Sequence, residues 1–167
     1  MEVKDGPYPI EECHKPEYET LGLFGALCLN EDLPSIFKAN DLCNRAGLDT
    51  ISTASVIGFA MECYERGIIT KDDADGLELR WGNGEAIVRL VEKIIKREGI
   101  GDLLADGVRR ASQRLGRGSE EWAVHAGGQE LPAHDPRYDP GYGTTYQAEP
   151  TPGRHTITSY TFIELMD

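Results

Sequence analysis

One segment of this chain, residues 50–66, constrains the fold more than any other because it is a long, largely apolar stretch with helical character. Its apolar side chains fall on more than one side of a helix, which is typical of a helix surrounded by other elements. Gly67 follows it and can adopt the left-handed conformation that ends a helix. We therefore expect a mainly α protein packed around this segment. The apolar positions are Ile51, Ala54, Val56, Ile57, Phe59, Ala60, Met61 and Tyr64.

The rest of the chain up to Gly116 also shows helical spacing of apolar residues. We expect helices over residues 15–30, 33–45, 84–97 and 102–115. After Gly116 prolines and glycines accumulate, and we expect a short strand at residues 122–125 with loops beyond it. The patterns predict a mainly α domain, residues 1–116, followed by an irregular C-terminal extension, residues 117–167.

The turn that precedes the apolar segment carries the chemistry that we can argue from residues alone. Gly47 can end one helix in the left-handed conformation, and Leu48 can then fold back on that helix. Asp49 is a residue type that caps a new helix. Such a junction presents backbone N–H groups and a carboxylate at one point, so it could hold a polar ring with amide and amine groups, as in a pterin.

Composition excludes some classes of partner. The 167 residues are 40% hydrophobic and 28% charged, with a net charge of −12 and a pI near 4.7. Nucleic acid and anionic membranes both require a basic face, so we expect neither as a partner. No apolar run has the length of a membrane span, and the N-terminus lacks the apolar region of a signal peptide. We therefore expect a cytoplasmic protein.

The four cysteines show no metal-binding spacing. Cys13, Cys28, Cys43 and Cys63 include no CxxC pair, so they predict neither a zinc site, nor an iron–sulfur site, nor a disulfide framework. Buried, reduced thiols are the expected state. No residue of this chain is assigned as a metal ligand.

The turn and its flanks resemble a known family. Residues 44–49, NRAGLD, match the DxxGLD motif of the tungsten-containing aldehyde ferredoxin oxidoreductase family, and NDLCN before it and FAMECYERGIIT after it extend the match. The resemblance implies that residues 1–116 form a multi-helical orthogonal domain and that the extension of residues 117–167 begins the next domain. It also implies pterin contacts from Asn44, Gly47, Leu48 and Asp49. Asn44 replaces the first acid of the motif, and an amide can donate where a carboxylate only accepts.

The same resemblance implies acid–base residues. PEYET looks like the segment that places a glutamate beside the metal, so Glu17 or Glu19 would exchange protons with the substrate, with Glu17 preferred. PTPGRHT resembles a segment in which a histidine approaches the metal. It implies His155 as the active-site histidine and Arg154 as a contact to an anionic group. His125 and His134 have weaker claims.

His134 also marks a departure from the family. GGQELPAHDPR resembles the family pattern GxELPAYDPR, in which a tyrosine is common where this chain has His134. Because the resembled region passes to the last domain and lines the metal cavity, this difference bears on the substrate.

As a whole, the resemblance implies a portion of an enzyme that oxidises aldehydes to carboxylic acids at a tungsten bis-molybdopterin centre. Electrons would leave through a [4Fe–4S] cluster to ferredoxin. The CxxCxxxC triplet of that cluster is absent from this sequence, so its ligands are expected outside the chain, and the remaining domains of the enzyme are expected partners. The family also includes reductases of aromatic thioesters. The alternative is a non-catalytic helical domain that mediates domain or subunit contacts.

Overall fold

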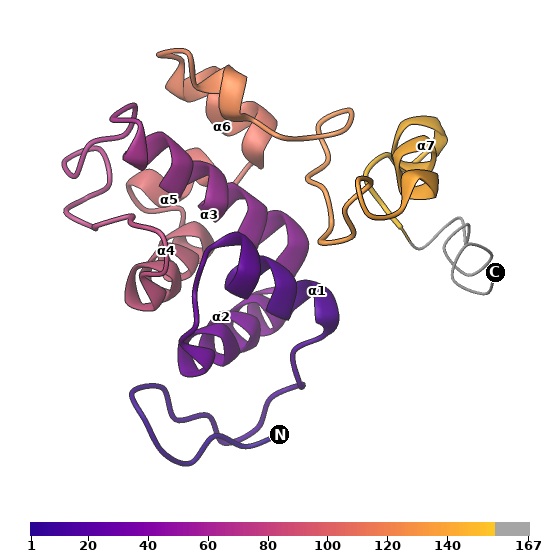
Figure 1. Cartoon of the computed structure of the whole chain (residues 1–167). Helices are drawn as coiled ribbons and strands as arrows, with labels where there is room; N and C mark the ends of the chain where they lie inside the picture. The colour runs from indigo at the N-terminus through magenta and orange to yellow at the C-terminus, as the bar shows by residue number, and fades with distance from the viewer. Residues whose placement is uncertain (156–167) are drawn as a thin grey trace.

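The structure is a computed structural model, which describes residues 1–155 and contains helices but no strand within that range (Figure 1). Two isolated β-bridges, Val3–Ile10 and Ala126–Gln129, are the extent of β pairing in these residues. The prediction of a mainly α fold is confirmed. The elements are α1 (Tyr18–Leu21), the π-helix η1 (Gly22–Leu27), α2 (Leu33–Ala46), α3 (Thr50–Glu65), α4 (Gly84–Lys96), α5 (Ile100–Leu104), α6 (Val108–Leu115), the 3₁₀-helix η2 (Ser119–Trp122) and α7 (Pro140–Ala148).

The helix α3 forms the centre of the core, as its sequence predicts. It contacts α1, η1, α2, α4, α6 and η2, and its residues Ile57 and Met61 have no exposed surface. The four cysteines are buried and free, also as predicted, and burial raises the pKa of the Cys28 thiol to about 12. Within residues 1–155, no helix is both long and apolar enough to cross a membrane.

Three local predictions differ from the structure. The segment predicted as one helix, residues 102–115, is divided between α5 and α6 because Gly107 adopts a positive φ of 84°. Residues 122–125 form no strand, and Trp122 instead ends η2. The loop predicted after them contains α7, which begins at Pro140 and is capped by the Asp139 side chain accepting from Gly141 N.

The segment predicted as a helix over residues 15–30 is also shorter and less regular than expected. After α1 it widens into the π-helix η1, where hydrogen bonds span one residue more than in an α-helix. A Cβ added at Gly22 would lie 2.9 Å from the Cβ of Ala133. The absence of a side chain at Gly22 therefore lets the later loop approach this helix closely.

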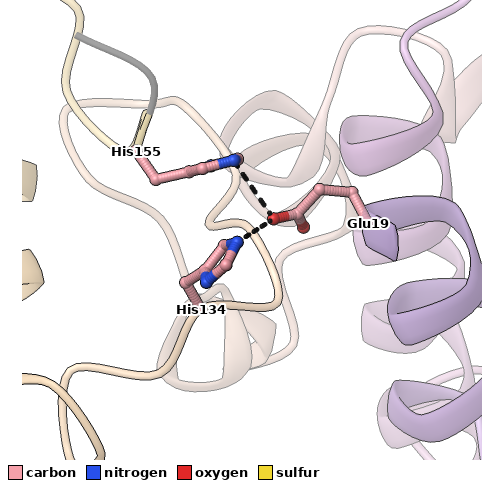
Figure 2. Close-up of side chains that lie close together, drawn as sticks. All are labelled: Glu19, His134 and His155. Carbon is pink, nitrogen blue, oxygen red and sulfur yellow. Dashed lines mark ion pairs between the residues drawn. The ribbon is translucent and has the colours of Figure 1, made fainter. Parts of the chain in front are cut away.

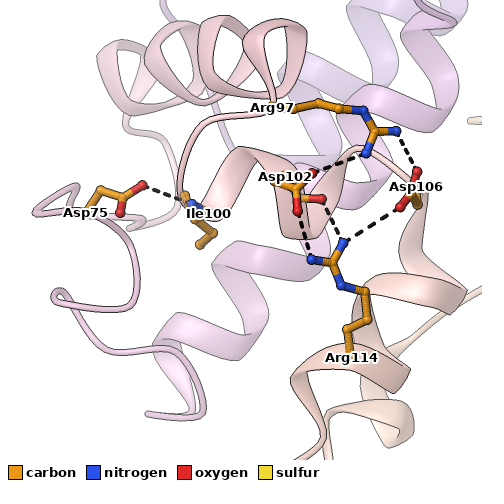
Figure 3. A network of polar contacts seen from close by, with 6 residues as sticks. All are labelled: Asp75, Arg97, Ile100, Asp102, Asp106 and Arg114. Atoms are coloured by element: carbon orange, nitrogen blue, oxygen red, sulfur yellow. Dashed lines mark hydrogen bonds and ion pairs between the residues drawn. The ribbon is translucent and has the colours of Figure 1, made fainter.

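Ion pairs and backbone contacts join α4, α5 and α6 (Figure 3). Arg97 pairs with Asp102 at 3.2 Å and with Asp106 at 2.6 Å, and Arg114 pairs with the same two carboxylates at 2.8 and 3.7 Å. At the start of α5, the backbone N–H of Ile100 donates to the Asp75 carboxylate. These contacts fix the short helix α5 between its two longer neighbours.

Residues 70–73 form a capping box, and Arg117 connects this box to the loop after α6. The Thr70 N–H donates to Asp73, the Asp73 N–H donates to the Thr70 hydroxyl, and the Arg117 guanidinium pairs with Asp73 at 2.9 Å. The Arg117 hydrogen bond is the largest of the effects that lower the pKa of Asp73 below its usual value. A carboxyl with a lowered pKa stabilises the fold at neutral pH and loses this contribution as the pH falls.

Replacing Arg117 with Gln should therefore reduce stability at neutral pH, and wild type and variant should converge as the pH falls from about 5 to about 2. Urea unfolding at several pH values measures the difference. The matched control is Lys15→Gln, which removes one positive charge at an exposed position. An Arg117→Gln deficit that is the same at every pH would show that Asp73 titration does not contribute.

Candidate active site

The predicted helix–turn–helix junction forms at residues 43–51. Gly47 has φ 70°, and the Leu48 N–H donates to the Cys43 carbonyl at 2.9 Å, which closes the end of α2. Asp49 caps α3, because its Oδ1 accepts from the Ile51 N–H at 2.8 Å. The turn predicted from sequence is thus confirmed, and it presents Asp49 at the start of the buried helix.

Arg154 approaches this turn from the other end of the chain. Its Nη2 pairs with Asp49 Oδ2, although the two residues are 105 positions apart. The Arg154 side chain is 18% exposed, and its Nη1 is buried with no hydrogen-bond partner among residues 1–155. A buried guanidinium nitrogen without a partner costs free energy, and an anionic group at this place would satisfy it.

Next to this pair, Glu19, His134 and His155 converge from three segments (Figure 2). Glu19 Oε1 lies 3.2 Å from His134 Nε2 and 3.5 Å from His155 Nε2. Glu19 is 13% exposed, and this oxygen accepts no hydrogen bond within the described part of the chain. We call these three residues the Glu19 cluster.

Neighbouring groups hold Glu19 and His134 in place. Glu19 Oε2 accepts from the Ala133 N–H at 2.6 Å, so the loop that carries His134 also orients the carboxylate. The Tyr146 hydroxyl of α7 donates to the His134 carbonyl at 2.8 Å. The Thr20 hydroxyl donates to the Thr50 hydroxyl at 2.9 Å, which joins α1 to the start of α3. These bonds keep the Glu19 cluster beside the Asp49 turn.

Other aromatic rings lie close to the His134 and His155 rings. The His134 ring lies 4.4 Å from that of His155 and 5.0 Å from the rings of Tyr18 and Tyr142, measured between centroids. Burial lowers the pKa of His155, an effect that Glu19 opposes and that His134 and Arg154 reinforce. The neutral imidazole of His155 is therefore favoured, which suits a group that accepts a proton.

The structure brings together some of the predicted site residues and not others. Glu19, Arg154, His155 and Asp49 lie in one region, whereas the preferred Glu17 is exposed and outside the Glu19 cluster. Asn44 is exposed on the last turn of α2, and neither Asn44 nor Leu48 is among the residues that pair with Arg154.

His134 is the residue that sequence reasoning undervalued. The signal for it was present, because it stands in the ELPAHDPR segment where a tyrosine is common in the resembled family. His125 has a local role instead, accepting from the Gly128 N–H at 3.2 Å.

An open cavity of about 1000 Å³ adjoins the Glu19 cluster. It runs between η1 and α3 on one side and the loop of residues 121–137 on the other, and both Tyr18 and His134 line it. Most of its surface is apolar, contributed by side chains such as Leu27, Phe59 and Trp122. A small apolar molecule in this cavity would therefore reach the His134 end of the cluster.

The cluster also has the composition of a metal site. Glu19, His134 and His155 each offer one ligand atom, and these atoms lie within 4.8 Å of one another. Among residues 1–155, these three residues form the one group of at least three carboxylate, imidazole or thiol side chains whose ligand atoms lie this close together. The site can thus either exchange protons or bind a cation.

The chain belongs to the aldehyde ferredoxin oxidoreductase family. The model of that family's domains 2 and 3 matches residues 1–165, which include the turn and the Glu19 cluster.

Relatives of known name agree with this assignment. The chain is 42% identical over 147 residues to the tungsten-containing aldehyde ferredoxin oxidoreductase of Pyrococcus furiosus, and 41% identical over 141 residues to that of Thermococcus kodakarensis. These matches cover 87% and 84% of this chain but 24% and 23% of the relatives. It is also 35% identical over 163 residues to the WOR-like subunit of an aliphatic sulfonate oxidoreductase of Pyrococcus furiosus, covering 94% of this chain and 26% of that subunit. The chain therefore spans about a quarter of the length of these relatives.

A solved structure shares the fold. The active-site complex BamBC of benzoyl coenzyme A reductase, in complex with 1,5-dienoyl-CoA, superposes with a TM-score of 0.67 and 28% sequence identity. The match covers 90% of this chain and 23% of that chain. The likeness is thus to one region of a larger redox enzyme.

Proposed function

We propose that this chain is a portion of an enzyme that oxidises aldehydes to carboxylic acids. In this reaction an aldehyde and water give a carboxylic acid, two protons and two electrons. The observation that carries the proposal is the meeting of Glu19 and His155, at 3.5 Å, beside a turn of the family's pterin-binding type. Groups that exchange protons are required wherever such an oxidation takes place.

The residues present fit the cofactor that the family name implies. Arg154 Nη1 is buried and has no hydrogen-bond partner among residues 1–155, so it could bind an anionic group of a pterin cofactor. A Cβ added at Gly47 would meet nothing within 4 Å, so the space above this turn is open to a flat ring. Asp49, Gly47 and Leu48 would hold the pterin, with Asn44 nearby on α2. A tungsten–bis-pterin group, when bound, supplies the two-electron redox chemistry.

The residues of this chain would accept and transfer the protons that the oxidation releases. The neutral His155 would accept a proton released as the carboxylic acid forms, and Glu19 would stabilise the imidazolium that results. The Ala133 N–H would hold the Glu19 carboxylate in place meanwhile. The apolar cavity would seat the side chain of the aldehyde and exclude water from it. Electrons would pass to ferredoxin through a [4Fe–4S] cluster whose ligands lie outside this chain.

The test uses the intact enzyme that contains this chain, purified without oxygen and analysed for tungsten, pterin and aldehyde oxidation. We expect Asp49→Ala to lower tungsten and pterin content several-fold, and His155→Ala to retain both while losing most of the activity. A wild-type protein that folds normally but holds neither tungsten nor pterin would contradict the proposal. It would leave a non-catalytic helical domain that mediates domain or subunit contacts as the better explanation.

A second candidate is reduction of an aromatic thioester. It is favoured by the likeness to benzoyl coenzyme A reductase and by the apolar cavity beside His134. The same preparation can be assayed with an aldehyde and with benzoyl coenzyme A. Activity towards the thioester alone would replace aldehyde oxidation with this second function.

A further inference from the structure

We propose that Glu130 is a positioning residue, which anchors the loop of residues 126–137 to the start of α6 and thereby sets the orientation of the Glu19 carboxylate. The catalytic consequence of this role rests on the proposed function, whereas the anchoring itself can be measured without any activity. Glu130 lies outside the Glu19 cluster.

The Glu130 side chain is almost entirely shielded from water. The residue is 3% exposed, and its Oε1 accepts from the N–H of Val108, the first residue of α6, at 2.6 Å. An N–H at a helix start has no partner within the helix, and the helix dipole favours a carboxylate there. Burial of a carboxylate costs free energy that such a bond offsets, so the loop is held where the bond can form.

The backbone before α6 is shaped to admit this carboxylate. Gly107 has a φ of 84°, and a Cβ added to it would lie 2.7 Å from Glu130 Oε1. Any other residue type at position 107 would therefore strain the backbone and push the carboxylate away from Val108. The glycine and the glutamate fit each other although they are 23 positions apart.

Other contacts between this loop and the helices are longer. Arg109 Nη1 donates to the Gly127 carbonyl at 3.4 Å in an exposed position, and Gln129 Nε2 donates to the Ser52 hydroxyl at 3.3 Å. Both distances exceed the usual range of about 2.7–3.2 Å, so these bonds are weak. Of the three contacts, the buried bond of Glu130 is the one able to fix the loop.

The anchor lies close to the groups that orient the site. Ala133 follows Glu130 by three positions, and its N–H donates to Glu19 Oε2 at 2.6 Å. The Glu130 carbonyl also lies against the later segment, because a Cβ added at Gly153 would lie 3.3 Å from that oxygen. His155 follows Gly153 by two positions. Glu130 therefore supports both segments that bring partners to Glu19.

Glu130→Ala in the intact enzyme should lower kcat for aldehyde oxidation by about 10²-fold, the loss that follows a misplacement of about 1 Å at a catalytic group. Glu130→Gln keeps an oxygen that can accept from the Val108 N–H, so it should retain most of the wild-type kcat. The matched control is Glu120→Ala, which removes a carboxylate at an exposed position and should leave kcat unchanged.

A double variant tests whether Glu130 acts through Glu19. Groups that act as a unit have non-additive effects, so Glu130→Ala combined with Glu19→Gln should have a kcat within about threefold of Glu19→Gln alone. If the two losses multiply instead, Glu130 merely stabilises the fold, and the positioning role is overturned.

Amide hydrogen exchange of the intact enzyme, read by mass spectrometry, tests the anchoring without any activity. Peptides from residues 131–137 should exchange faster in Glu130→Ala and at the wild-type rate in Glu130→Gln, while α2 and α3 stay unchanged in both. A wild type without aldehyde oxidation would contradict the proposed function, and this measurement would still decide whether Glu130 anchors the loop. Wild-type exchange of residues 131–137 in folded Glu130→Ala would overturn the proposal.

A second variant removes the other partner of the bond. Val108→Pro eliminates the N–H that donates to Glu130, at the first position of a helix, where proline is well tolerated. It should produce the same faster exchange of residues 131–137, and it decides the matter if Glu130→Ala does not fold. Unchanged exchange in Val108→Pro would show that the bond does not hold the loop.

Discussion

Replacing Glu19 with Gln in the intact enzyme should lower kcat for aldehyde oxidation by about 10²–10⁴-fold, the usual contribution of a positioned acid–base group. Gln keeps the size of Glu and an oxygen that can accept the Ala133 N–H, but it cannot carry the charge that would stabilise a protonated His155. Tungsten and pterin content should remain at the wild-type level. Steady-state kinetics with a simple aliphatic aldehyde, together with metal analysis, measures both quantities.

The matched variant is Glu17→Gln, two residues away on the same segment. Its side chain is exposed and lies outside the Glu19 cluster, so its kcat should stay within about twofold of wild type. Comparison of the two variants also decides which of the two glutamates is the active-site carboxylate, a choice that the sequence left open. A large loss in Glu17→Gln with normal turnover in Glu19→Gln would show that the sequence-based preference for Glu17 was right and that the geometry misleads.

The features that sequence predicted well are those fixed by neighbouring residues. The turn at Gly47 and the Asp49 cap depend on backbone conformation and on hydrogen bonds that span only a few positions. The buried helix α3 follows from its own composition. The same reasoning could have found α7, because Asp139 followed by Pro140 is a helix-start signal, although the glycines at 141 and 143 weaken helical propensity.

The Glu19 cluster could not be predicted in this way. Glu19 is separated from both His134 and His155 by more than 100 positions. Local periodicity carries no information about which loops return to which helix. The choice between Glu17 and Glu19 depends on where α1 begins. Glu17 is the N-cap of α1, with extended backbone angles and an exposed side chain, whereas Glu19 lies inside the helix and is less exposed. The close approach of the later loop also requires Gly22 opposite Ala133, a contact that is visible only in three dimensions.

Gly101→Ala should lower the free energy of unfolding by about 3 kcal/mol, the upper part of the range for overpacking. A Cβ on Gly101 would lie 2.2 Å from the carbonyl carbon of Lys93 and 2.6 Å from the nitrogen of Ile94. These are backbone atoms of α4, so no side-chain rotation can relieve the clash, and α5 must move away from α4. That movement would strain the Asp75–Ile100 contact and the Arg97 and Arg114 ion pairs (Figure 3).

Gly143→Ala separates this steric effect from the general effect of adding a methyl group to a helical glycine. Gly143 lies within α7, and the nearest atom to its added Cβ is the Pro136 Cβ at 3.4 Å. Since alanine favours helix over glycine by about 1 kcal/mol, this variant should be neutral or slightly more stable than wild type. Chemical unfolding of wild type and both variants measures the change in free energy of unfolding at each position. The comparison is valid if the m-values of the variants equal that of wild type. Equal changes at the two positions would mean that α5 and α4 are not in tight contact, and that the geometry at the start of α5 is wrong.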